Sequence, residues 1–524
     1  MKKILATVLA LVTLAAFTSC GGEKKSSSEL ILNNGSEPQS LDPSKIQGVP
    51  EHRIYMALFE GLVSYDPKTN FAIPGVAESW ERSGEEGEIV TFHLRQTTWS
   101  DGTPITAQTF VDSWLYYMDP NTAAEYAYMP AGIIKGAAAY NAGEADASSV
   151  AIRAVDDYTF EVTLVGSVPY AVDMMAHYSF APLPLHVIKE KGDDWTKPGN
   201  FVGNGPFVLS EWKPQEKIIV VPNEKYWNKE NVFLSKITFM PIENQTTQYN
   251  AFKNGEIDWA TEAPLEMLDE IKLSKNYHVA PQLSSYYYEF NINDEVLGDV
   301  RVRKALAMSI DKQQLVDKIL KGGQIAADAF VPPMGDYVPA KGNAYDVEAA
   351  KALLAEAGYP NGEGFPTMTV IYNTNDNHKK IAEYVQQQWK ENLGIDVVLE
   401  NLEWATFLDE RQNNHFQIAR AGWVGDYADP SNFLELCLKD GGNNDGRYNN
   451  PKFDELLRQA STMQAGKERD DVLNQAEEIL ITQDQAFIPF YYYVSQNLID
   501  LDKWDGWYTN ILDIHPYVGL KARE

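Results

Sequence analysis

Residues 367–400 read TMTVIYNTNDNHKKIAEYVQQQWKENLGIDVVLE. The short β-branched run at 367–372 is typical of a buried strand, and residues 395–399 (IDVVL) have the same character. Between them, residues 379–392 place a mostly apolar stripe on one helical face, and Gly394 follows as a stop signal. The stripe consists of Ile381, Ala382, Tyr384, Val385 and Trp389. This order predicts a βαβ unit with two parallel strands and a right-handed crossover.

The same alternation continues outside this unit. Residues 301–310 and 312–321 have the pattern of helices, and a Gly-Gly pair ends the second one. Residues 90–94 and 158–165 are typical of strands in an antiparallel region. We therefore expect an α/β protein with more than one sheet. A chain of 524 residues is too long for one ordinary core, so roughly two to four domains are expected.

The composition is that of a foldable and strongly acidic chain. Apolar residues make up 44% and charged residues 23%, so the chain can build real cores. The 74 acidic residues exceed the 44 basic residues by 30, and the net charge is −30. A surface of this sign repels phosphate backbones, which argues against nucleic-acid binding.

The N-terminus has the pattern of an export signal. Lys2 and Lys3 precede an apolar run at residues 4–17, which at ~1.5 Å per residue is too short to cross a ~30 Å membrane core. The junction at Cys20 resembles a bacterial lipoprotein signal, although Phe17 stands where leucine is usual. An ordinary secretory signal with an incidental cysteine is the alternative.

The lipoprotein interpretation defines the start of the mature chain. Residues 1–19 would be removed as signal peptide, Cys20 would be lipidated, and residues 20–28 would form a flexible tether. We expect an exported, membrane-anchored lipoprotein that faces the periplasm or the cell exterior. The one remaining cysteine, Cys437, lies in an apolar run and is expected to be buried.

No local pattern of reaction chemistry occurs in the sequence. The eight histidines include no helical metal pair, and no phosphate loop, serine elbow or dinucleotide fingerprint is present. Residues 443–446 (NNDG) lack the ligand series of a calcium loop and are interpreted as a turn. We therefore expect a binding protein without cofactor or metal, and not an enzyme.

Several motifs occur in the order of one known family. They are PGVAESW at 74–80, TFHLR at 91–95, WSDGTP at 99–104, FVDSW at 110–114, GNGPF at 203–207, YYYEFN at 286–291, VRVRKAL at 300–306 and ARAGWVGDY at 419–427. Together with NNGSEPQSLDP at 33–43, they resemble the extracellular solute-binding proteins of the peptide/nickel class (family 5), and most closely the oligopeptide-binding branch. The resemblance runs from about residue 29 to the end of the chain.

This resemblance implies a fold and a division into domains. The fold is the type II periplasmic-binding-protein fold, in which three domains form two hinged lobes that enclose the ligand. Domain I is expected to be discontinuous, with residues 29–50, 185–280 and 494–524. Residues 51–184 are expected to form domain II, and residues 281–493 domain III.

The resemblance also implies roles for charged residues. Asp426 matches the residue that binds the peptide ammonium, although an aspartate in Gly-Asp-Tyr also suits a turn. Arg420, Arg411 and His378 match positions that meet the carboxylates of ligands of different length. Arginine suits a bidentate carboxylate contact. A surface position for Arg411 and a solvated helix start for His378 are the alternatives.

Further positions match the backbone edges and the walls of the family's pockets. An extended ligand is expected to pair like an added strand with edges on both lobes, and large aromatic residues would line roomy pockets. The edges correspond to Ser36, Glu37 and Pro38 and to Ala421, Gly422, Trp423 and Val424; the walls correspond to Trp404, Trp423, Tyr286 and Tyr288. Either tryptophan could instead be core, and because side chains alternate along a strand, only one or two of the tyrosines at 286–288 can face the cleft.

The implied function is that of the substrate-binding lipoprotein of an ABC transporter. It would capture oligopeptides by their backbone and termini and deliver them to a permease driven by separate ATPase subunits, and it is expected to be a monomer. The acidic composition favours cationic peptides as a hypothesis. Dipeptides, murein peptides or another small solute on the same fold are the first alternative, and an exported peptide hydrolase is the second. A display role as adhesin or receptor stays open.

Overall fold

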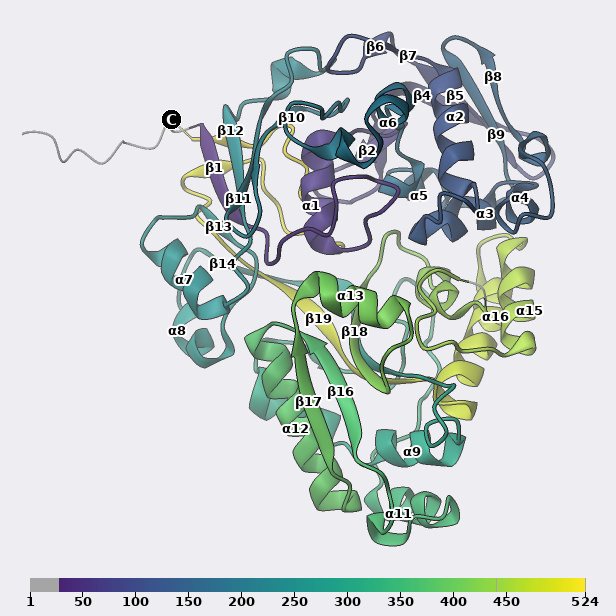
Figure 1. Ribbon diagram of the computed structural model, residues 1–524, viewed down its shortest axis with the longest axis vertical. Helices are drawn as coiled ribbons and strands as arrows, with labels where there is room; N and C mark the ends of the chain where they lie inside the picture. The colour runs from purple at the N-terminus through teal and green to yellow at the C-terminus, as the bar shows by residue number, and fades with distance from the viewer. Residues whose placement is uncertain (1–27, 440, 524) are drawn as a thin grey trace, which may run out of the picture.

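The quoted segment folds as the sequence predicts. Strands β16 (Met368–Asn373) and β17 (Val397–Leu402) pair in parallel on either side of helix α12 (Asp376–Leu393). The predicted stripe of α12 is buried, and Gly394 adopts φ +73°, a left-handed conformation that glycine reaches without steric cost. The computed structural model describes residues 28–439 and 441–523, so the predicted signal peptide and Cys20 lie outside the described residues (Figure 1).

The largest sheet has eleven strands and runs through both halves of the molecule. Its upper half in Figure 1 holds β1 and β10–β13 with helix α1, and its lower half holds β16–β18 with α12. Its strand order is β10 (Phe207–Lys213), β11 (Lys217–Pro222), β12 (Lys236–Met240), β1 (Glu29–Asn33), β13 (Trp259–Ala260), β19 (Phe487–Ile499), β14 (Tyr277–Phe290), β18 (Ile418–Val424), β16 and β17, and β15 (Ile325–Ala326) also pairs with β19.

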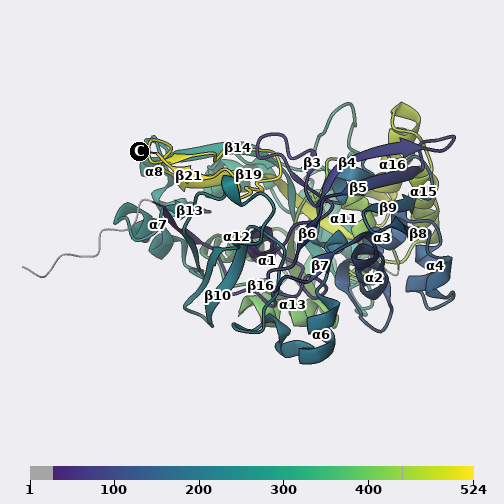
Figure 2. The same ribbon diagram turned by 90° about the horizontal axis from the view of Figure 1, so that it is seen from above.

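The long antiparallel strands β14 and β19 connect the two halves. Residues 277–281 pair with 494–498 on the side of β13, and residues 285–289 pair with 487–492 on the side of β18. The register shifts between these two ladders, after Pro281. Figure 2 shows both strands side by side at the edge of the molecule. In the strand order of the described residues, this pair alone joins one half of the sheet to the other.

A second sheet confirms the predicted antiparallel region. It has the order β4 (Ala77–Ser83), β5 (Ile89–Leu94), β9 (Thr159–Thr163) and β8 (Ile152–Asp156), and helix α2 (Ala107–Met118) packs against it. A capping box at Thr106 starts α2. Trp114 of α2 is buried against Phe160 of β9, with the two ring centres 4.9 Å apart. The expectation of an α/β protein with more than one sheet is confirmed.

The other helices have the following bounds. They are α1 (Val49–Leu58), α3 (Tyr128–Ile133), α4 (Ala137–Asn141), α5 (Ala171–Met174), α6 (Leu185–Lys191), α7 (Gln245–Lys253), α8 (Leu268–Ile271), α9 (Val300–Met308), α10 (Lys312–Gln314), α11 (Val347–Glu356), α13 (Trp404–Gln412), α14 (Ser431–Leu434), α15 (Pro451–Ser461) and α16 (Lys467–Glu478). The predicted helix at 301–310 corresponds to α9. The one predicted at 312–321 becomes α10 and a π-helical turn at Leu315–Leu320.

Cys437 is fully buried, as expected. Of the helices within residues 28–439 and 441–523, none combines the length and apolarity needed to span a bilayer. In the same part of the chain, no three histidine, cysteine or acidic side chains are grouped so that they could hold a metal ion.

Candidate functional site

A cavity of about 340 Å³ lies between the two halves of the large sheet. Its wall combines segments of the upper half, namely residues 33–36, α1 and residues 512–515, with α12, α13 and β18 of the lower half. Nine predicted site residues line it: Ser36, His378, Trp404, Arg411, Arg420, Gly422, Trp423, Val424 and Asp426. The fold thus brings together positions that lie almost 400 residues apart in sequence.

Strand β18 presents an open edge to this cavity. One edge of β18 pairs with β14 along its whole length. On the other edge, β16 pairs only with Ile418 and Ala419, so within the described strands residues 420–424 have no partner on that side. Unpaired backbone N–H and C=O groups along a strand are a template for a further strand.

Asp426 lies just beyond this edge with a carboxylate that lacks a charged partner. Its side chain is 12% exposed, and burial raises the pKa of the carboxyl to about 7, against a hydrogen bond from Asn432. Its Oδ2 atom has no partner among the described residues. His177 Nε2 lies 3.4 Å from Asp426 Oδ1. His177 Nδ1 accepts from the backbone N–H of Ser179, which leaves the ring proton on Nε2.

Burial keeps the neighbouring His177 neutral. This imidazole is fully buried, and desolvation lowers its pKa well below the ordinary value. It therefore cannot neutralise the carboxylate, and its Nε2 forms no hydrogen bond among the described residues. The surrounding wall is aromatic: Tyr126 stacks on Trp423 with ring centres 6.0 Å apart, and the His177 ring lies 4.9 Å from Tyr126. A cation bound to Asp426 would meet ring faces on this wall.

Arg420 carries a positive charge at the other end of the open edge. Its guanidinium donates to the Tyr493 hydroxyl at 2.8 Å and to Asn373 Oδ1 at 3.2 Å, and lies 5.0 Å from the Tyr286 ring centre. Among the described residues it forms no ion pair, and its buried Nε has no partner. Arg420 is therefore able to receive a carboxylate.

Arg411 lines the same cavity but is already paired. Its Nε lies 2.6 Å from Glu289 Oε1, and its Nη2 lies 2.9 Å from Asp445 Oδ2. Burial raises the pKa of Glu289 to about 7, with the nearby Arg411 acting against this shift. Two carboxylates for one guanidinium leave little positive charge for a ligand.

His378 cannot act as a cation here. Its ring is buried, and desolvation, together with the nearby Arg420, lowers its pKa well below the ordinary value. The residue stands in the first turn of α12, whose N-cap Asn375 accepts from its backbone N–H. The ring nitrogen Nδ1 has no partner among the described residues, so a neutral hydrogen bond to a ligand is available.

Trp404 connects the lower half to α1. Its indole Nε1 donates to Glu51 Oε1 at 3.3 Å, and its ring stacks on Phe407 with centres 6.1 Å apart. The side chain is half-buried and lines the cavity.

Five predicted site residues are not brought to the cavity wall. Tyr286 and Tyr288 share the core face of β14, where both are fully buried, and neither lines the cavity. Tyr287, on the opposite face, does line it. The Glu37 carboxylate is turned away and accepts from Trp212 and from the backbone of Gln215. Pro38 and Ala421 are buried outside the cavity wall.

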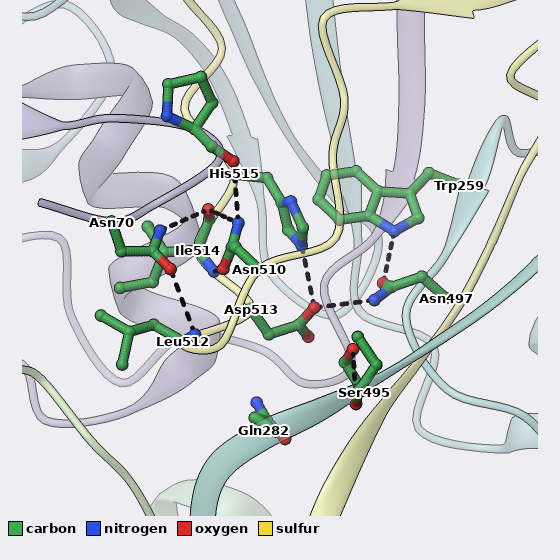
Figure 3. A network of polar contacts seen from close by, with 12 residues as sticks. Asn70, Trp259, Gln282, Ser495, Asn497, Asn510, Leu512, Asp513, Ile514 and His515 are labelled. Atoms are coloured by element: carbon green, nitrogen blue, oxygen red, sulfur yellow. Dashed lines mark hydrogen bonds and ion pairs between the residues drawn. The ribbon is translucent and has the colours of Figure 1, made fainter. Parts of the chain in front are cut away.

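A polar network on the upper wall was not predicted from the sequence (Figure 3). Asp513 Oδ1 lies 2.8 Å from Asn497 Nδ2 and 2.9 Å from His515 Nε2, and the Trp259 indole donates to Asn497 Oδ1 at 2.8 Å. Figure 3 shows these groups converging from β13, β19 and the C-terminal segment. They are single polar residues in unrelated stretches, so no spacing in the sequence indicated them. His177 and Arg53 were missed for the same reason.

Comparisons with known proteins place the chain among solute-binding proteins. The family described as bacterial extracellular solute-binding proteins, family 5 Middle, matches residues 72–445. The periplasmic oligopeptide-binding protein OppA of Salmonella typhimurium is 39% identical over 520 residues, which cover 96% of this chain and 94% of the relative. The Haemophilus influenzae OppA complex with the peptide RPPGFSPFR has a TM-score of 0.90 and 35% identity, covering 94% of this chain and 99% of that one.

Two structures of another relative report on the conformation. The murein tripeptide-binding protein MppA of Escherichia coli has a TM-score of 0.89 and 37% identity, covering 95% of this chain and 99% of that one. An unliganded open form of MppA has a TM-score of only 0.62 and 36% identity, covering 94% of this chain and 97% of that one. The lobes of the present chain are therefore not arranged as in the open form. The predicted periplasmic-binding-protein fold is confirmed by these similarities.

Proposed function

Because the chain belongs to family 5 of the bacterial extracellular solute-binding proteins, we propose that it is the substrate-binding component of an ABC importer for oligopeptides. The peptide lies extended along residues 420–424, its ammonium on Asp426 and its carboxylate on Arg420. The observation that carries this proposal is the open edge of β18, which has an unpaired acid at one end and an unpaired base at the other.

The dimensions of this edge suit a short peptide. Arg420 and Asp426 are six positions apart in the sequence, which corresponds to at most ~20 Å at ~3.3 Å per residue. Both residues line the same cavity. A peptide of a few residues bridges that distance. Because the main chain and termini supply the contacts, the same site accepts many sequences.

The remaining parts of the proposal rest on the family and on the N-terminal pattern. The chain acts without catalysis, as a monomer, and passes its ligand to permease and ATPase subunits. Export and lipidation at Cys20 tether it to the membrane. Domains I and II form one lobe and domain III the other, with the division given from the sequence. The hinge lies where β14 and β19 change register, after Pro281.

Calorimetric titration of refolded, ligand-stripped protein tests the proposal. Tetra-alanine is compared with its N-acetylated and its C-amidated forms, and mass spectrometry of the mixture checks for cleavage. We expect tight binding of the free peptide, a loss of about 100-fold on acetylation and no cleavage products. Equal binding of the free and acetylated forms removes Asp426 from its role. Failure of all three to bind rejects oligopeptide capture, and cleavage supports a hydrolase.

A further inference from the structure

Arg53 is a second cation of the cavity wall that forms no ion pair with any described residue. It lies in α1, on the upper side of the cavity, whereas Arg420 lies in β18 on the lower side. Its Nη1 donates to the Asn34 carbonyl at 3.0 Å, and this is its only side-chain hydrogen bond among the described residues. A guanidinium has five N–H donors, so most of its donors remain available on the cavity side.

The acidic groups near Arg53 are occupied elsewhere. Burial lowers the pKa of Arg53, and the negative charges of Asp513 and Glu262 act against this shift. Both carboxylates are therefore close enough to interact electrostatically with Arg53. Asp513 Oδ1 is held by Asn497 and His515 (Figure 3). Glu262 Oε2 accepts from Gln245 and, at 3.0 Å, from Asn375. Neither carboxylate lies within ion-pair distance of Arg53.

Resting on the proposed function, we propose that Arg53 is a second carboxylate-binding group of this cavity. An arginine that lines a desolvated cavity with free donors is suited to a planar, bidentate carboxylate. Arg53 receives either an Asp or Glu side chain of a peptide whose terminal carboxylate is held by Arg420, or, in place of Arg420, the terminal carboxylate of a longer peptide. In the first case the site favours acidic peptides, in contrast to the cationic preference that the overall charge of −30 suggests.

Paired peptides distinguish the two sources of the carboxylate. Tetra-alanine is titrated with Glu or Gln at each position in turn, and penta- and hexa-alanine are titrated as acid and as amide. Wild-type protein is compared with Arg53→Met and Arg53→Lys. Arg153→Met is the control, because Arg153 is an exposed arginine that pairs with Glu161 on the four-stranded sheet.

We expect at least one Glu peptide to bind about 10-fold more tightly than its Gln counterpart, as a charged hydrogen bond allows. R53M should abolish this difference, R53K should retain part of it, and R153M should leave it unchanged. If R53M instead abolishes the acid-over-amide preference of the longer peptides, Arg53 binds the terminal carboxylate.

The proposal is overturned if R53M weakens Glu and Gln peptides equally, since the contact with Asn34 would then be merely structural. It is also overturned if R53M changes neither discrimination. Absence of peptide binding by the wild type is a different result, which rejects the proposed function itself.

Discussion

At the scale of single residues, the site depends on charges that the surrounding side chains do not compensate. Asp426 faces a neutral His177, and Arg420 faces only hydroxyl and amide oxygens. A buried charge without a counter-charge destabilises the protein that holds it. In the proposed complex a zwitterionic peptide would supply both counter-charges at once, so the energetic cost in the free protein would become selectivity for such a ligand.

The first prediction concerns Asp426→Asn. The folded-state pKa of Asp426, about 7, lies above the unfolded value, so its stabilising contribution is present at low pH and is lost as the pH rises through 7. The neutral amide avoids this loss, and D426N should be more stable than wild type at pH 8, by on the order of 2–4 kcal/mol, and unchanged or less stable at pH 4. Chemical unfolding of the ligand-free protein at both pH values measures this.

The same variant, D426N, should bind peptides with a free amino terminus more weakly than the wild type does. Binding of an ammonium requires the ionised carboxylate, so wild-type affinity should rise between pH 6 and pH 8, whereas the D426N affinity should be lower by about 100-fold at pH 8 and flat with pH. N-acetylated peptides serve as the control, because they carry no ammonium. A wild-type pH profile that is equally flat would contradict the assignment.

The second prediction distinguishes Arg411 from Arg420, which were both predicted from the sequence to bind peptide carboxylates. Arg411→Met leaves Glu289 and Asp445 buried without their cation, so it should lower the free energy of unfolding by roughly 3–5 kcal/mol. Arg420→Met breaks no ion pair and should leave stability nearly unchanged while removing the preference for peptide acids over amides. Denaturant unfolding and calorimetric titration of both variants provide the comparison. If R411M were stable and R420M unfolded, the two roles would be exchanged.

At the scale of elements, periodicity predicted which segments are helices and strands. The 367–400 unit is regular because its strands are buried and its helix has a single apolar face. In β14 the alternation was also recognised, but three consecutive tyrosines give no indication of which face is the core. That choice depends on the packing of Tyr286 against Tyr491 of β19, with ring centres 4.8 Å apart, and a partner 200 residues away is invisible to local patterns.

The site was predictable only where the family resemblance supplied positions. Asp426, Arg420 and the β18 edge carry a recognisable motif, and the structure places them at one cavity. The ion-pair partners of Arg411 were not predictable, because Glu289 and Asp445 come together with it only in the folded chain. Arg53 and His177 belong to no local pattern of charge or spacing, so only tertiary structure identifies them.

The third prediction belongs to strand β18. A Cβ atom on Gly422 would lie 2.6 Å from the Tyr493 hydroxyl and 2.9 Å from Arg420 Nη2. Both atoms end flexible side chains, so Gly422→Ala should fold with nearly unchanged stability but displace the Arg420–Tyr493 pair. We expect the preference for peptide acids over amides to fall about 10-fold. Gly132→Ala is the control, since its Cβ would meet no atom within 4 Å.

At the scale of the whole molecule, direct contacts between the two halves influence how much of the ligand's binding energy is needed to close them. The segments that line the cavity belong to different halves, and of the strands that the structure describes, β14 and β19 alone carry the large sheet between these halves. Contacts formed elsewhere between the halves therefore stabilise the closed form without touching a ligand. Tyr170, after β9, stacks on Tyr427, after β18, with ring centres 4.7 Å apart and an interplanar angle of 8°.

Tyr170→Leu tests this separation of closure from recognition. The leucine keeps an apolar side chain but removes the stack and the contact of the hydroxyl with Ser431, which measures 3.3 Å. A stacked pair contributes about 0.5–1.5 kcal/mol, so closure should become less favourable by that amount and affinity should fall by roughly 3- to 10-fold. Because the two stacked rings do not contact the ligand, the loss of affinity should be the same for tetra-alanine, its amide and its Glu variants.

X-ray scattering gives a second measurement: at subsaturating peptide, the variant should show a larger radius of gyration than the wild type. A loss confined to one class of peptide would instead place Tyr170 in recognition, and an unchanged affinity would mean that the stack persists when the lobes open.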